Sequence, residues 1–184
     1  MKLTSGSDNL SAERRIHAAV VLIALLVFGS AAYADDRAIP QTTAANQNWV
    51  VSLGGKVKHP QQFDLETLQR LPAQQVTVSY QTGRGVEEAS FTGVSLWTLL
   101  GEAGGIDDPA KSAELRHVIR ITARDGYVVV LSTGEIAPDF GAKPALLAYR
   151  RNDEAPAAAG FRLAMPGDKH GGRYVRDVIS IEVE

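Results

Sequence analysis

Two runs of residues that favour β-strands lie only three residues apart in the second half of the chain. HVIRITA (117–123) and YVVVLS (127–132) are separated by Arg124, Asp125 and Gly126. Asp-Gly between two such runs is a strong hairpin signal, because both residues tolerate the backbone conformations that a tight turn requires. The sequence therefore predicts an antiparallel hairpin here and a fold built on short strands.

Other short β-type runs recur between glycine, proline and aspartate residues. The further predicted strands are WVVSLGG (49–55), VTVSY (76–80), ASFTGV (89–94), PALLAYR (144–150), FRLA (161–164) and VISIEV (178–183). KVKHPQQF (56–63) is expected to be a turn and QTGRGVEE (81–88) a loop.

Helical patterns are few and short. Asp64 and Ser95 are suitable N-caps for predicted helices over 65–71 and 96–103, and residues 133–138 fit one further helical turn. The class is α+β, with mixed or antiparallel β-sheets and two or three short helices in a single domain over 49–184.

The first 34 residues are typical of an export signal. Arg14 and Arg15 precede an apolar run, 16–28, and an Ala-x-Ala site ends at Ala34. The run is shorter than the ~20 apolar residues of a membrane span. We expect a signal peptide over 1–34, a flexible linker over 35–48, and a periplasmic or secreted protein without a stable membrane span in the mature chain. An uncleaved anchoring helix and twin-arginine export are the alternatives.

Charge and cysteine content exclude several functions. The mature chain carries 16 basic and 19 acidic residues, because the leader removes three of the 19 basic and two of the 21 acidic residues. A net charge of −3 is no footprint for nucleic acid, which favours extended basic surfaces. The chain has no cysteine, which excludes disulfides and thiolate metal sites. His59, His117 and His170 are too widely separated to predict a metal site.

Five segments, in this order, carry a resemblance to a known family. They are LGGKVKHPQQFDLETLQRLP (53–72), FTGVSLWTLLGEAG (91–104), ARDGYVVVLS (123–132), LLAYRRNDEAP (146–156) and RLAMPGDKHGGRYVRDVISIEV (162–183). Together they resemble the oxidoreductase molybdopterin-binding domain, the sulfite oxidase fold, in its short single-domain exported form.

The resemblance implies molybdopterin as the candidate cofactor. In catalytic members, a cysteine thiolate in the loop after the strand corresponding to VTVSY ligates molybdenum. This chain reads SYQTGRG (79–85) there, with Ser79 or Tyr80 in the approximate place of the cysteine. We therefore expect no bound metal and assign no catalytic residue.

MPGDKHGGRYVRD (165–177) is the strongest site candidate. Four of its residues are basic or titratable near neutral pH: Lys169, His170, Arg173 and Arg176. A bend at the two glycines would let the cations converge, and freed backbone N–H groups can line an anion site. The resemblance implies that Arg173 contacts the anion. The alternative is a solvated loop whose charges pair with its own aspartates, Asp168 and Asp177.

Three further residues are candidates for the same pocket. Arg84 lies in the loop that the family places at the mouth of the cofactor site, and Tyr80 and Tyr127 are pocket candidates. A surface arginine and a tyrosine packed with its hydroxyl satisfied are the alternatives for Arg84 and Tyr127.

The sequence and the resemblance leave three candidate functions. The preferred one is an exported, non-catalytic module that binds a small anionic ligand or a periplasmic protein partner at the basic, glycine-rich end. The second is a molybdopterin-dependent oxidoreductase subunit, and the third is a structural or assembly module without a ligand. Fold alone does not decide among them, because function resides in the site.

Overall fold

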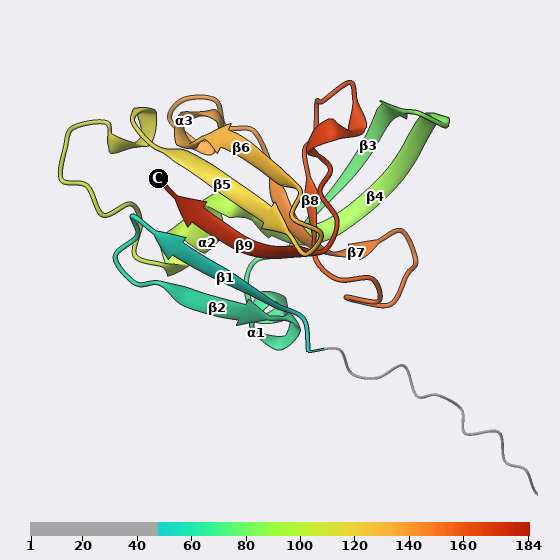
Figure 1. The fold of residues 1–184 in the computed structure, drawn as a ribbon, viewed down its shortest axis with the longest axis horizontal. Coiled ribbons are helices and arrows are strands. Elements are labelled where there is room, and N and C mark those ends of the chain that lie inside the picture. The colour runs from blue at the N-terminus through green and yellow to red at the C-terminus, as the bar shows by residue number, and fades with distance from the viewer. Residues whose placement is uncertain (1–47) are drawn as a thin grey trace, which may run out of the picture. The chain divides into compact units, whose positions relative to one another are not determined.

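Two β-sheets form the body of the protein in the computed structural model, which describes residues 48–184 (Figure 1). The predicted signal peptide, 1–34, and the linker up to residue 47 lie outside the described residues. The strands are β1 (Val50–Gly55), β2 (Gln61–Asp64), β3 (Gln74–Thr82), β4 (Gly85–Ser95), β5 (Val118–Ala123), β6 (Val128–Ser132), β7 (Leu146–Arg151), β8 (Arg162–Ala164) and β9 (Val178–Val183).

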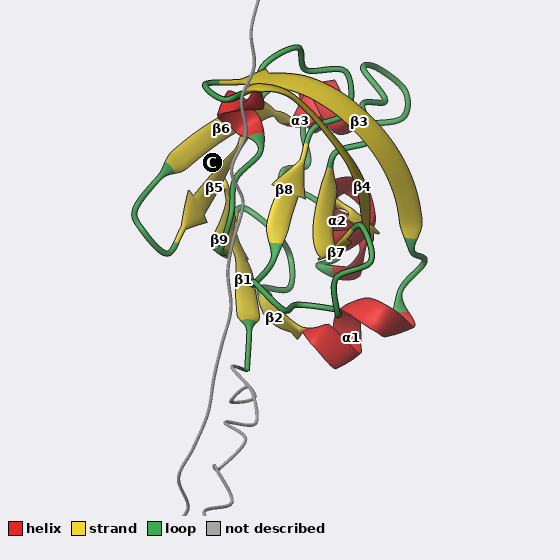
Figure 2. Ribbon diagram, turned by 90° about the vertical axis from the view of Figure 1, so that its right-hand side faces the viewer, coloured by secondary structure: helices red, strands yellow, loops and turns green. Residues whose placement is uncertain are grey.

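The strand order of the two sheets is β2-β1-β9-β5-β6 and β3-β4-β7-β8. β1 and β9 are parallel, whereas every other strand pair in these sheets is antiparallel. The predicted Asp125-Gly126 hairpin is the β5–β6 pair. Figure 2 shows β3 and β4 curving together along one side of the molecule.

Three short α-helices and two 3₁₀ turns connect the strands. They are α1 (Leu65–Arg70), α2 (Leu96–Glu102), α3 (Thr133–Ile136), η1 (Ala113–Leu115) and η2 (Gly171–Arg173). Asp64 and Ser95 cap α1 and α2 as predicted, each accepting a hydrogen bond from the backbone N–H three residues later. No helix within 48–184 is long and apolar enough to cross a bilayer.

The apolar core has two parts, one on each face of the second sheet. The larger part joins both sheets to α2 and includes Leu53, Leu99, Ile121 and Leu147. A smaller cluster covers the opposite face and contains Val78, Tyr80, Ala89, Phe91, Leu146, Ala148 and Ala164, with Tyr174 packed against it. Alternate residues of β7 therefore reach different clusters, and the strand is buried on both faces.

Two sequence expectations are wrong in detail. Strand β2, Gln61–Asp64, covers the last three residues of the expected turn 56–63 and pairs with β1. The expected loop 81–88 is mostly strand, because β3 and β4 stay paired until Thr82 and Gly85 and leave only Gly83 and Arg84 to form the turn. Otherwise the structure confirms the α+β class, the mixed sheets and the three short helices.

Candidate functional site

The end of β3 and the glycine-rich segment 165–177 meet in space. The backbone N–H of Gln81 donates to the carbonyl of Lys169 over 2.8 Å, and Gln81 forms an isolated parallel bridge with His170. Gly171 then packs on Tyr80, so closely that a Cβ added there would lie 3.1 Å from Cδ2 of the Tyr80 ring. The lack of a side chain at Gly171 thus allows the two segments to approach.

A cavity of about 540 Å³ opens where these segments meet. Its walls come from the β3–β4 hairpin, β8 and the glycine-rich segment. The residues that line it are Tyr80, Gln81, Thr82, Gly83, Glu87, Phe91, Arg162, Leu163, His170, Gly171, Gly172, Tyr174, Val175 and Arg176.

Aromatic rings form part of the cavity wall. Tyr80 and Tyr174 stack with ring centroids 4.0 Å apart, and Phe91 lies tilted at 6.1 Å from Tyr174. The hydroxyl of Tyr174 donates to the carbonyl of Met165, and burial raises the pKa of Tyr174 to about 12. Both tyrosines are therefore neutral near pH 7 and give the cavity a flat, weakly polar surface.

Three side chains give the cavity its basic character. Arg162 projects from β8, and His170 and Arg176 come from the glycine-rich segment. Within residues 48–184, none of these three side chains makes a hydrogen bond or an ion pair with another side chain, so their donors are available to a ligand. Such donors are suited to a carboxylate, sulfate or phosphate group.

Glu87 is the acidic residue in the cavity wall, and it is already engaged. Its carboxylate accepts hydrogen bonds from the Tyr80 hydroxyl and from the Arg151 guanidinium. Partial burial raises the pKa of Glu87, but these hydrogen bonds outweigh burial and leave the pKa below its ordinary value. Burial, followed by the hydrogen bond to Glu87, raises the pKa of Tyr80. Arg151 thus offsets the negative charge that would otherwise repel an anion.

Arg173 does not line this cavity. Its guanidinium donates to Asp168 over 2.7 and 2.6 Å and to Glu135 over 3.1 and 3.2 Å. Lys143 joins the same two carboxylates at 2.6 and 3.2 Å. The hydrogen bonds to Asp168 raise the pKa of Arg173, with burial acting against them. The arginine implied by the resemblance therefore takes part in a four-residue ion-pair network.

Of the other predicted residues, one lines the cavity and three have side chains outside its lining. Tyr80 lines the cavity, whereas Ser79 faces the opposite side of β3 and is exposed. Arg84 is exposed in the hairpin turn and lies outside the lining. Lys169 is exposed and reaches the site only through its backbone carbonyl.

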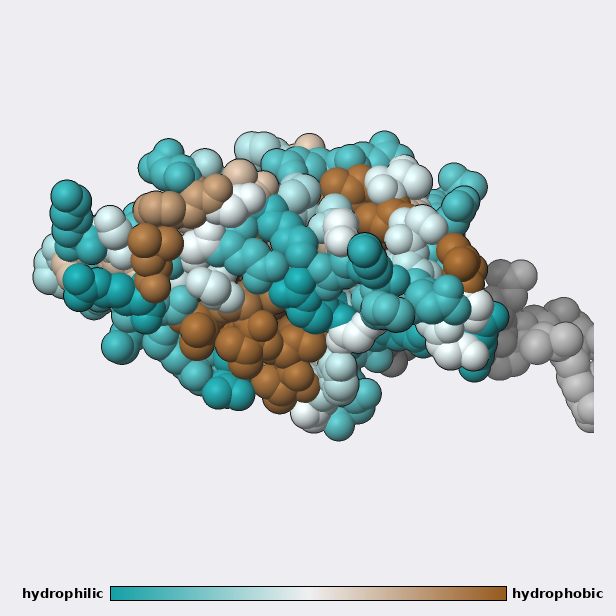
Figure 3. Space-filling view, turned by 90° about the horizontal axis from the view of Figure 1, so that it is seen from above, coloured by the Kyte–Doolittle hydropathy of each residue, from teal (hydrophilic) through white to brown (hydrophobic). Residues whose placement is uncertain are grey.

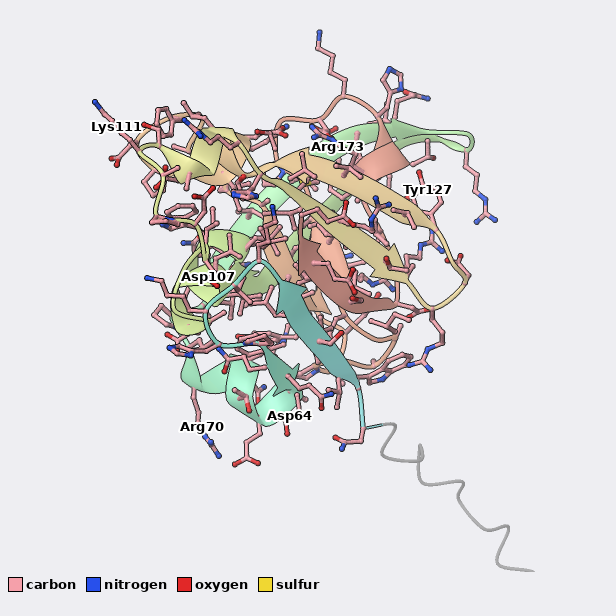
Figure 4. All side chains as sticks on the ribbon, turned by 60° about the vertical axis from the view of Figure 1, so that its left-hand side comes forward. Asp64, Arg70, Asp107, Lys111, Tyr127 and Arg173 are labelled. Atoms are coloured by element: carbon pink, nitrogen blue, oxygen red, sulfur yellow. The ribbon has the colours of Figure 1, made fainter. Side chains whose placement is uncertain are left out.

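Tyr127 borders a second depression of about 460 Å³ on the other side of Gly171 and Gly172. Its hydroxyl donates to the carbonyl of Gly172 over 2.7 Å, so the hydroxyl is satisfied although half of the side chain is exposed. Arg176 lines both depressions. In Figure 4, Arg173 and Tyr127 lie toward the same end of the molecule, far from Asp64 and Arg70.

The donor set of the cavity does not fit a ligated metal. The Tyr80 hydroxyl is bound to Glu87, the Glu87 carboxylate is bound to Arg151, and the chain has no thiol to offer. Within 48–184, no group of three His, Asp or Glu side chains is placed to hold a metal ion. The free donors instead fit an anionic group.

Comparison with known proteins places the chain in a family. The model of the oxidoreductase molybdopterin binding domain family matches residues 37–184, and the chain belongs to this family. No curated protein matches.

A solved structure with the same fold is the sulfane dehydrogenase SoxCD from Paracoccus pantotrophus, at 20% sequence identity and a TM-score of 0.59. The match covers 73% of this chain but only 38% of the SoxCD chain. This likeness supports the sulfite oxidase-type fold predicted from the sequence.

Proposed function

We propose that this chain is an exported, non-catalytic module that binds a small anionic ligand in the basic cavity. The observation that carries the proposal is the convergence of Arg162, His170 and Arg176, without side-chain partners in the described residues, on one cavity. An arginine side chain that makes no ion pair or side-chain hydrogen bond attracts anions, and it can bind a planar carboxylate or a phosphate through two parallel hydrogen bonds.

The cavity wall indicates that the ligand carries a flat or apolar part besides its anionic group. The Tyr80 and Tyr174 rings, with Phe91, Leu163 and Val175, offer an apolar surface beside the cations. A ligand that places a flat or apolar part there removes water from both surfaces, which strengthens the neighbouring charge interactions. We therefore favour a small organic anion over a bare inorganic ion, and a protein partner that presents such a group is the second form of the same proposal.

A thermal-stabilisation titration tests this function. The probes are inorganic phosphate, sulfate and a pterin carboxylate, each added to wild type, Arg162→Ala, Arg176→Ala and Arg84→Ala. A ligand at 100 times its Kd stabilises the folded state by about 2.7 kcal/mol. Loss of one charged contact should weaken binding by about 1.5–3 kcal/mol, or about tenfold or more in Kd.

Arg84→Ala is the matched control, because it removes the same charge from the hairpin turn outside the cavity lining. We expect it to bind each probe as wild type does. Equal weakening by all three variants would indicate nonspecific charge attraction and would count against the cavity, as would the absence of stabilisation by every probe.

The second candidate function is a molybdopterin-dependent oxidoreductase subunit, which the family match over 37–184 favours. When bound, molybdopterin would supply redox chemistry at molybdenum. The chain offers that metal no thiolate, so an unusual ligand or a partner chain would complete the site. Metal content separates the two functions.

A further inference from the structure

The wall of the basic cavity carries a carboxylate oxygen that is free to accept a hydrogen bond. Tyr80 and Arg151 both donate to Oε1 of Glu87, and within residues 48–184 Oε2 of Glu87 makes no hydrogen bond or ion pair. No buried side-chain oxygen or nitrogen in the described part of the chain lacks a partner, so Oε2 is open to solvent. Because a carboxylate accepts hydrogen bonds at both oxygens, Glu87 keeps capacity for a donor on a ligand.

Glu87 and the unpaired cations occupy separate places on the cavity wall. Arg176 and Glu87 both line the cavity but form no ion pair with each other. Burial raises the pKa of Glu87, but the hydrogen bonds from Tyr80 and Arg151 and the positive charges of Arg151 and Arg176 leave the pKa below its ordinary value. Glu87 is therefore ionised at neutral pH. The cavity thus presents one negative group and, apart from it, unpaired positive groups.

A ligand with only negative charge does not match this wall. If it fills the cavity, it displaces water from Oε2 of Glu87 and offers no hydrogen bond in return, and a charged acceptor without a partner costs free energy. An ammonium group supplies three hydrogen-bond donors and no acceptor. The aromatic faces of Tyr80, Tyr174 and Phe91, which form part of the same wall, also attract a cation.

The size and surface of the cavity suit a small organic molecule that carries both charges. Its volume of about 540 Å³ is that of a small-molecule site. Figure 3 views the molecule from the end that carries η2 and the tip of the β3–β4 hairpin in Figure 1, and it shows hydrophilic residues interspersed with brown apolar patches.

We propose that the ligand is a zwitterion of the amino-acid class, whose carboxylate binds the unpaired cations and whose ammonium group binds Oε2 of Glu87. The unpaired cations are Arg162, His170 and Arg176. This inference rests on the proposed function, because it assigns a ligand class to the same cavity. Glu87 is then the residue that selects a zwitterion over a plain anion.

Calorimetric titration of wild type with L-phenylalanine and L-phenyllactate tests the ligand class. The two probes share a carboxylate and a phenyl ring and differ only in an ammonium against a hydroxyl group. At neutral pH we expect L-phenylalanine to bind about tenfold or more tightly, since hydrogen bonds between two charged groups are the stronger ones.

Equal affinity of the two probes, or tighter binding of L-phenyllactate, overturns the zwitterion and leaves anion binding in the cavity intact. Binding of neither probe also overturns the zwitterion. The proposed function fails with it only if phosphate, sulfate and the pterin carboxylate give no thermal stabilisation either. None of these comparisons on wild type depends on the folding of a variant.

Glu87→Gln tests the selecting residue. Glutamine keeps an oxygen that can accept from Tyr80 and Arg151 but removes the charge that attracts an ammonium group. We expect this variant to raise the Kd of L-phenylalanine about tenfold and so to bring the two probes to similar affinity. The control is Glu88→Gln, because Glu88 is the next residue on β4, exposed and outside the cavity lining. Equal loss of L-phenylalanine affinity in the two variants, or no loss in either, overturns the proposal.

Discussion

At the scale of single residues, the site depends on Gly171, because a side chain at this position would crowd the ring of Tyr80 and destabilise the fold. Gly171 lies on the ring of Tyr80, which is itself stacked on Tyr174 and hydrogen-bonded to Glu87. The ring has little freedom to move away from an added methyl group, since packed interiors absorb extra volume poorly. Gly172 is the opposite case, with open space where its Cβ would lie.

We predict that Gly171→Ala unfolds at lower urea concentration than Gly172→Ala. The expected difference in the free energy of unfolding is about 1–3 kcal/mol, the usual cost of overpacking. Comparing the two variants cancels the loss of unfolded-chain entropy that accompanies every Gly→Ala change. Equal stability of the two variants would show that Tyr80 moves freely and that the close approach is unimportant.

The cavity residues differ in how far the sequence can reveal them. His170 and Arg176 stand out in the sequence because the charged motif 165–177 interrupts two apolar runs. Arg162 does not stand out, because it lies within the apolar run FRLA, and Glu87 sits in a segment expected to be loop. Arg173 and Arg176 look equivalent in sequence, yet only the fold places Asp168 and Glu135 around Arg173.

At the scale of elements, the β3–β4 hairpin shows why local patterns mislead. Residues 81–88 contain two glycines and two adjacent glutamates, which read as a solvated loop. They are nevertheless paired, because Val76 on β3 already lies opposite Phe91 on β4. The same register continues outward to the pair Thr82 and Gly85. Strand β2 is similar. It contains two glutamines and directly follows Pro60, so its sequence does not indicate the short edge strand that it forms. In both cases tertiary pairing overrides weak local preference.

The ion-pair network holds the glycine-rich segment in place. Asp168, on that segment, binds Arg173 and Lys143, and Glu135 on α3 closes the network. Burial raises the pKa of Asp168, but the hydrogen bonds from Arg173 and Lys143 outweigh it and leave the pKa below 3.8. The carboxylate form is therefore the one that stabilises the fold.

Because the folded-state pKa of Asp168 is lowered, the effect of Asp168→Asn on stability should depend on pH. A carboxyl group with a lowered folded-state pKa contributes stability in full above its unfolded pKa and loses it as pH falls through the folded pKa. We expect wild type to exceed the variant by about 1.5–3 kcal/mol at pH 7, with the gap closing below about pH 4.

Urea denaturation at pH 7, 5 and 3 measures the gap between wild type and Asp168→Asn. The control is Asp153→Asn, since Asp153 is exposed in a loop and makes no ion pair within residues 48–184. A gap that does not change between pH 7 and pH 3 would contradict the assigned role of the network.

At the scale of the whole molecule, one sheet and the glycine-rich segment carry the candidate ligand site. The β3–β4–β7–β8 sheet and the glycine-rich segment build the cavity, while the five-stranded sheet packs against the first sheet through the larger part of the core. Tyr127 links the five-stranded sheet to the glycine-rich segment, because it directly precedes β6 and its hydroxyl donates to the carbonyl of Gly172. The five family-like segments were sufficient to predict this architecture, since their order reflects the entire fold rather than any one contact.

The central claim is that a molybdopterin-domain fold here holds an anion without molybdenum. The direct test purifies the full protein from cells that synthesise molybdopterin, then measures molybdenum and tungsten by mass spectrometry and oxidised pterin by fluorescence. Our account predicts metal far below one atom per chain. Pterin without metal would identify an organic anion for the cavity. One molybdenum or tungsten atom per chain would contradict the account and establish the oxidoreductase alternative.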